Sequence, residues 1–69
     1  MDTTGTAPHD VLLTPAEAAE RLRVSADALY RWRRKNVGPR WTRVGDGLGR
    51  IRYPAAELTQ YLQEQAAAA

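Results

Sequence analysis

Two helix-start signals close together in the chain constrain its fold more than any other feature. The first is Thr14-Pro15-Ala16-Glu17, a capping box in which the threonine hydroxyl accepts a backbone N–H, the glutamate reaches back, and proline takes the first helical position. The second is Ser25, which can cap a helix directly after a tight turn over residues 23–25. The sequence therefore predicts one helix from residue 15 to residue 22 or 23 and another over residues 25–35, joined as a helix-turn-helix.

The second of these helices separates an apolar side from a basic side. Leu29 and Trp32 fall on one side of a helical wheel, so we expect Trp32 to anchor the core. The other long side chains point elsewhere: Tyr30, Arg31, Arg33, Arg34 and Lys35. One face of this helix can therefore pack while the other meets phosphate.

Charge is distributed very unevenly along the chain. Residues 31–52 hold eight basic side chains against one acid, Asp46, a net charge of +7, whereas the whole chain has a formal net charge of +2. Such a polarised molecule presents a positive field to a polyanion, which favours nucleic acid over a generic acidic partner. The alternative is a solvated arginine-rich surface, although surface charge normally mixes signs.

A hairpin is predicted after the second helix. The run Asn36-Val37-Gly38-Pro39 ends that helix, because glycine supplies a left-handed cap and proline cannot continue. Residues 40–44 and 50–53 then alternate around the glycine-rich loop 45–49, which predicts two strands. The side chains expected to face the core are Thr42, Val44, Ile51 and Tyr53. Those expected on the outer face or the tip are Trp41, Arg43, Arg50 and Arg52, which would make the hairpin an arginine-lined wing.

Trp41 has two interpretations. In this register it is exposed on the outer face of the wing, where a large aromatic side chain more often contacts another protein. A shift of the register by one residue would bury it instead. The sequence leaves both interpretations open.

The remaining segments complete the predicted domain organisation. A third helix restarts at Pro54, with an inward stripe of Leu58, Tyr61 and Leu62. The first helix carries a narrow apolar stripe of Ala16, Ala19 and Leu22. We expect a disordered leader over residues 1–10, a winged-helix domain over 11–63 and an alanine-rich tail over 64–69. The fold class is α+β and mostly helical: a winged helix-turn-helix with a β-hairpin wing and a C-terminal helix.

Composition excludes several other kinds of protein. With 69 residues the chain is one domain, and without cysteine and with one histidine, His9, it has neither a disulfide framework nor a common zinc spacing. Ser25 is the only serine, and no histidine or paired carboxylate lies near it in the sequence to activate it. We expect no enzyme activity, no metal and no cofactor. The chain also shows no membrane span and no signal peptide, so we expect it in the cytoplasm.

Taken together, these residues resemble the small winged-helix proteins of the excisionase, or recombination directionality factor, family, which is related to the MerR-like DNA-binding domain. The resemblance covers roughly residues 11–63. It rests on residues 12–19, 24–32, 38–40, 43–45, 51–53 and 57–62. The same module serves excisionases and small transcriptional regulators. Regulators of the larger MerR type usually append a dimerisation helix or an effector domain, and the end of this chain soon after the third helix favours an excisionase.

The resemblance implies that the second helix lies in the DNA major groove. The expected contacts from this helix are Ala26, Asp27, Ala28, Tyr30, Arg31, Arg34 and Lys35. Arg31 and Arg34 can contact phosphates or fork to guanine O6 and N7, and Tyr30 can bond a phosphate or pack on a sugar. The Asp27 carboxylate could accept a hydrogen bond from the N4 amino group of cytosine. Alternatively, an acid in the first turn of a helix is simply favoured by the helix dipole. Ala28 stands where many family members have threonine, so the side chain offers no polar group there, although its methyl group could contact a thymine methyl.

The resemblance also implies that the wing reaches an adjacent minor groove. Its expected contacts are Arg43, Asp46, Gly47, Arg50 and Arg52. Arg50 follows the glycine loop and is the expected minor-groove insertion, with Arg43 and Arg52 as flanking phosphate contacts. The alternative for each is a solvated strand arginine.

Three functions are compatible with these features. The first is an excisionase that binds double-stranded DNA cooperatively at repeated sites, bends it and directs an integrase toward excision in the bacterial cytoplasm, in association with the nucleoid. The second is a small MerR-like transcriptional regulator. The third is an interaction module whose basic face binds an acidic protein, which predicts weak DNA binding that does not discriminate between sequences.

Overall fold

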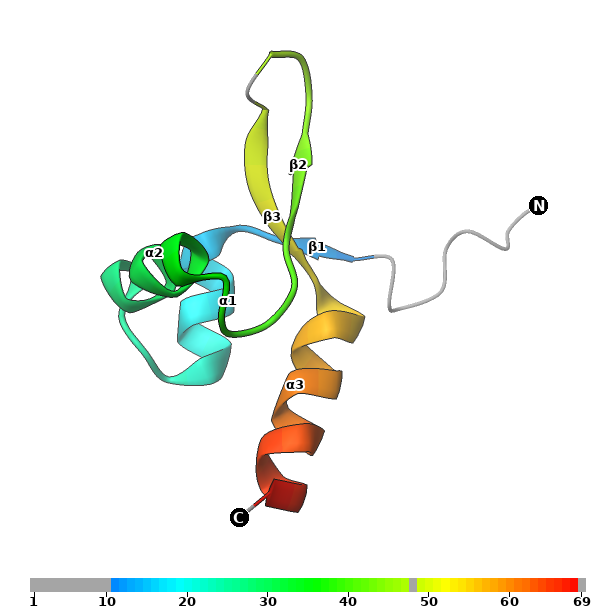
Figure 1. Cartoon of the computed structure of the whole chain (residues 1–69). Helices are drawn as coiled ribbons and strands as arrows, with labels where there is room; N and C mark the ends of the chain where they lie inside the picture. Colours follow the sequence, from blue (N-terminus) through cyan, green and yellow to red (C-terminus); the bar gives the residue numbers. More distant parts are fainter. Residues whose placement is uncertain (1–10, 48, 69) are drawn as a thin grey trace, which may run out of the picture.

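Three helices and a three-stranded antiparallel sheet build the part of the chain that this computed structural model describes, residues 11–47 and 49–68 (Figure 1). In chain order the elements are β1 (Leu12–Leu13), α1 (Pro15–Leu22), α2 (Ala26–Lys35), β2 (Thr42–Val44), β3 (Arg50–Pro54) and α3 (Ala55–Ala68). The hairpin of β2 and β3 projects beyond the helices, as Figure 1 shows. The predicted winged helix-turn-helix is confirmed. The leader predicted over residues 1–10 lies outside the described residues.

Local capping explains where the first two helices begin. The Thr14 hydroxyl accepts from the Glu17 backbone N–H at 3.1 Å, and the Glu17 carboxylate accepts from the Thr14 backbone N–H at 2.9 Å. Ser25 Oγ accepts from the Ala28 backbone N–H at 3.0 Å. Both predicted helix starts are confirmed, because each depends on residues three apart in the sequence.

The end of α2 differs from the prediction. The left-handed cap is Asn36, with φ of 60°, rather than a glycine. Asparagine tolerates this conformation better than most residues, since its short polar side chain can hydrogen-bond to the nearby backbone. Gly38 has φ of +87° and meets a separate requirement: a Cβ there would lie 2.7 Å from Trp32 Cε3. The glycine therefore lets the chain pass close to the indole ring.

A small core holds the elements together. The core cluster consists of the buried side chains of Leu13, Ala18, Ala19, Leu29, Tyr53 and Leu58. Trp32 is half-buried and packs against this core, which confirms its predicted anchoring role. The predicted stripe on α1 is partly wrong, because Ala16 is exposed and Ala18 is fully buried. Helix α1 contacts both α2 and β3, so its buried face centres on the adjacent pair Ala18 and Ala19.

Helix α3 packs through its first turns only. Leu58 is buried, and the half-buried Tyr61 ring lies 6.3 Å from the Trp32 ring, measured between centroids. Leu62 was expected to face inward but is 45% exposed. The helix runs away from the sheet and continues to Ala68 (Figure 1), and Leu62 is not among the side chains that pack against the core. In residues 11–47 and 49–68, no helix has the length and apolar character needed to cross a membrane.

Strand β1 was not predicted. Leu12 pairs with Pro54 and Leu13 with Tyr53, which gives the strand order β1-β3-β2. The Ala55 N–H donates to the Val11 carbonyl at 2.8 Å, and α3 begins at Ala55, one residue later than expected. A strand of two residues is too short to show the alternation that identifies a strand in a sequence.

The register of the hairpin corrects the predicted faces of β2. The pairs are Thr42 with Arg52, Arg43 with Ile51, and Val44 with Arg50. Directly paired residues share a face of the sheet. The face of Ile51 and Tyr53 therefore includes Arg43, and the core positions predicted for β3 are right. Those predicted for β2 are wrong, because Thr42 and Val44 are exposed.

The length of the loop accounts for this shift. Five residues of the sequence separate the paired Val44 and Arg50, whereas the predicted faces require an even number between paired residues. Trp41 consequently lies on the inward face, half-buried against the core. Of its two interpretations, the one-residue shift is the one that the structure supports.

Candidate nucleic-acid interface

The polar side of α2 is available to a ligand along most of its length. Six of its seven predicted contact residues are exposed: Ala26, Asp27, Tyr30, Arg31, Arg34 and Lys35. Ala28 is half-buried, so its methyl group is less accessible than expected. Leu29, on the opposite side, is completely buried. The buried leucine fixes the rotation of the helix, and this rotation directs the basic side chains outward.

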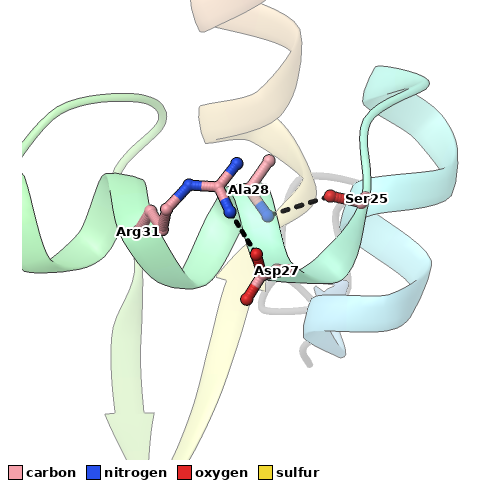
Figure 2. A network of polar contacts seen from close by, with 4 residues as sticks. All are labelled: Ser25, Asp27, Ala28 and Arg31. Carbon is pink, nitrogen blue, oxygen red and sulfur yellow. Dashed lines mark hydrogen bonds and ion pairs between the residues drawn. The ribbon is translucent and has the colours of Figure 1, made fainter.

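Two of the expected contact residues are paired with each other. Arg31 Nη1 donates to Asp27 Oδ2 one turn away on the same helix, beside the Ser25 cap (Figure 2). The Arg31 side chain is 58% exposed and that of Asp27 is 71% exposed. In water such a pair contributes little to stability. It does, however, give Arg31 a preferred direction on the exposed face.

A cleft of about 400 Å³ separates α2 from the hairpin. Three residues of α2 and three from the hairpin region line it: Tyr30, Arg33, Arg34, Trp41, Arg43 and Ile51. Three guanidinium groups and two large aromatic rings thus surround one cleft. Guanidinium groups recognise phosphate through charge and through several N–H donors, so the lining suits a phosphate backbone.

Arg33 is held in place on one side of this cleft. Its Nη1 donates to the Tyr53 hydroxyl at 2.9 Å, and its guanidinium carbon lies 5.8 Å from the Tyr30 ring centroid and 6.0 Å from that of Tyr53. Tyr53 is 1% exposed and belongs to the core. The side chain of Arg33 is therefore fixed to the rigid part of the fold before any ligand arrives.

Sequence reasoning placed Arg33 on the basic side of the helix but not among the expected contacts. No local pattern marks it, because Arg33 and Tyr53 are twenty residues apart and meet only through the packing of α2 on β3. The single available signal is indirect. A buried tyrosine usually finds a hydrogen-bond partner for its hydroxyl, and α2 offers several arginines.

The other cleft arginines also lie over aromatic rings. The Arg34 guanidinium is 5.9 Å from the Tyr30 ring centroid, and its Nη1 donates to the Tyr30 hydroxyl at 3.3 Å. The Arg43 guanidinium is 5.3 Å from the Trp41 ring centroid. Cation–π contacts of this kind restrict long side chains without neutralising their charge. The Tyr30 hydroxyl can still donate its own proton to a phosphate.

The structure does not bring the predicted wing residues onto one face. Arg43 lines the cleft, whereas Arg50 and Arg52 share the opposite face with Val44 and Thr42. Arg50 is exposed, and Arg52 is half-buried with its Nη1 donating to the Ile51 carbonyl at 2.7 Å. Asp46 and Gly47 are exposed at the tip. The wing therefore offers one arginine toward α2 and two on its far side.

A comparison with known protein families decides the identity of this arrangement. The model of the helix-turn-helix domain family matches residues 12–66, which extend from β1 well into α3. The chain belongs to the helix-turn-helix domain family. No curated protein and no solved structure gives a significant match. As a helix-turn-helix protein with a basic, exposed second helix, it is a sequence-specific DNA-binding protein.

Proposed function

We propose that α2 of this helix-turn-helix protein enters the major groove of double-stranded DNA while the hairpin reaches the adjacent minor groove. The observation that carries the proposal is the cleft between them, into which Arg33, Arg34 and Arg43 converge. A phosphate strand separates a major groove from its neighbouring minor groove. Elements that occupy both grooves must therefore hold that strand between them, and the cleft is lined with the side chains to do so.

Removal of a cleft arginine tests this binding geometry. Arg34→Ala should weaken binding to a duplex by about 1–3 kcal/mol if Arg34 makes a base contact, and by less if it contacts phosphate alone. Arg21→Ala is the matched control, because it removes the same charge from the exposed surface of α1, outside the cleft. Fluorescence anisotropy with a labelled duplex measures both variants. Equal losses of affinity in the two variants would mean that the net charge of the protein, rather than the cleft, determines binding.

We further propose that the protein acts as an excisionase, a recombination directionality factor that binds repeated sites near an attachment site, bends the DNA and directs an integrase toward excision. Two features support this role. The residues of the helix-turn-helix and of the hairpin resemble those of that family, and the positive cleft suits the bending of DNA around a small protein. The protein would act by binding alone, without catalysis, in the bacterial cytoplasm in association with the nucleoid.

Cooperative binding follows from the size of the module. A single domain of this kind covers only about 600–1,000 Å² of its own surface on DNA, which gives modest affinity. Copies bound side by side on repeated sites raise each other's effective concentration, so occupancy would increase steeply with protein concentration. Self-association on the DNA is therefore part of the proposal.

Electrophoretic mobility shifts on two DNA fragments test the excisionase role. One fragment spans the nearest integrase gene with its attachment site, and the other spans the promoter upstream of the protein's own gene. A cooperative ladder of bands on the first fragment, with a bending-dependent change of mobility, is the expected result. A single shifted band on the promoter fragment alone would instead indicate a MerR-like transcriptional regulator. Smearing on both fragments that disappears with salt would contradict both roles.

A further inference from the structure

The ion pair between Asp27 and Arg31 lies on the part of α2 that would face base edges. Arg31 is one turn from Asp27 on the same helix (Figure 2), and both side chains are more than half exposed. The contact uses Nη1 of Arg31 and one carboxylate oxygen, Oδ2. A guanidinium group carries five N–H donors in a rigid plane, so N–H groups on Nε and Nη2 stay available in the same plane.

The position of Asp27 is unfavourable for binding DNA in general. It introduces a negative charge beside a surface that is otherwise positive, and it would repel phosphate. The exposed pair also adds little to the stability of the free protein. An acid at this position therefore weakens non-specific binding. The first turn of a helix favours an acid through the helix dipole, and here the acid also gives Arg31 a direction.

We propose that Asp27 is a positioning residue that determines specificity: it holds Arg31 so that the free edge of the guanidinium forks to O6 and N7 of a guanine in the major groove. The inference rests on the proposed entry of α2 into that groove. Guanine is the base that presents two acceptors to a planar fork, and arginine is its commonest partner. DNA excludes water from the pair on binding, which strengthens the contact between carboxylate and guanidinium. In this account Asp27 touches no base itself.

A double-mutant cycle tests the inference. Selection of wild-type binding sites from a randomised duplex library first defines the preferred sequence and its guanine positions. Affinities are then measured for that duplex, for duplexes with each guanine pair replaced by an A·T pair, and for a random duplex. Discrimination is the ratio of the affinity for the preferred duplex to that for the duplex with an A·T pair at the tested position. Asp27→Ala should lower this ratio at one guanine position by about 5- to 10-fold, as expected when a bidentate contact loosens. It should raise the affinity for the random duplex.

Three further variants separate positioning from other roles. Asp27→Asn keeps an oxygen that accepts from Arg31 and should retain part of the discrimination. Glu20→Ala removes the same charge from the exposed surface of α1, outside the cleft, and should leave the discrimination unchanged. In an Arg31→Ala background, Asp27→Ala should have no further effect on discrimination. Circular dichroism checks that α2 stays folded in each variant.

Two results would overturn the inference while leaving the DNA-binding function intact. One is full discrimination in Asp27→Ala. The other is an equal loss of discrimination when Arg31 is already alanine, which would mean that Asp27 contacts a base directly. Failure of the wild-type protein to bind any duplex would instead overturn the proposed function together with the inference.

Discussion

Substitution of a buried tyrosine is predicted to weaken DNA binding at a surface that it does not reach. Tyr53→Phe keeps the ring, which is 1% exposed, and removes only the hydroxyl that accepts from Arg33 Nη1 at 2.9 Å. The core should therefore pack as before. Arg33 loses one of the two interactions that connect it to Tyr53, and only the position of the guanidinium over the ring, 6.0 Å from its centroid, is left.

The structure allows both effects of this change to be estimated. A hydrogen bond to a charged group contributes about 1.5–3 kcal/mol, and a half-buried guanidinium can regain part of this from water, so we expect a loss of about 1 kcal/mol of folding free energy. For a domain of this size, that lowers Tm by about 4–8 °C. An arginine that must be ordered on binding costs about 0.5–1.5 kcal/mol, which corresponds to a roughly 2- to 13-fold rise in Kd.

The assay combines thermal unfolding with anisotropy binding at a temperature where each variant is fully folded. Tyr61→Phe is the matched control, since it also removes a tyrosine hydroxyl, here from a half-buried side chain on α3 that does not line the cleft. Its Kd should equal that of the wild type. An unchanged Kd for Tyr53→Phe would refute the reasoning that a fixed Arg33 contributes to binding.

Three other substitutions test the packing and the wing. Gly38→Ala should cost about 1–3 kcal/mol in urea unfolding, because φ is +87° and the new Cβ would approach Trp32 Cε3. Gly47→Ala, with φ of +64° and open space around it, should lower the free energy of unfolding by less. Equal losses of stability in the two variants would mean that the contact with the Trp32 ring does not cause the loss in Gly38→Ala. Trp32→Ala should cost about 3–5 kcal/mol and remove most helical circular dichroism; a folded variant that no longer binds DNA would place Trp32 in the interface. Arg43→Ala should reduce the slope of log Kd against log salt concentration by about 0.9, the contribution of one phosphate contact. An unchanged slope would mean that Arg43 does not contact the DNA backbone.

The features that were predicted correctly depend on neighbours in the sequence. The Thr14 and Ser25 caps each join residues three apart, and the pairing of Leu29 with Trp32 on one face follows from helical periodicity. Alternation in β3 correctly placed Ile51 and Tyr53 toward the core. In each case the pattern and its physical cause lie within one element.

The features that were missed depend on how elements meet. Thr42 and Val44 were assigned to the wrong face because alternation alone does not show which set of side chains faces the core. The five residues between the paired Val44 and Arg50 decide this. Strand β1 exists only because Leu12 and Leu13 find β3 beside them. The contact between Arg33 and Tyr53 likewise needs the packed fold, and it changes the candidate site from an exposed helix face to a cleft with a fixed arginine.

The most direct test of the central claim is an NMR titration of the ¹⁵N-labelled protein with a short duplex. We predict the largest shift changes at the backbone amides of residues 30–34 and 41–43 and at the arginine side-chain N–H groups that line the cleft. The surface near Val11, Ala56 and Thr59, which lies outside the cleft, should change little. Shift changes concentrated on that surface, with α2 unaffected, would contradict the account.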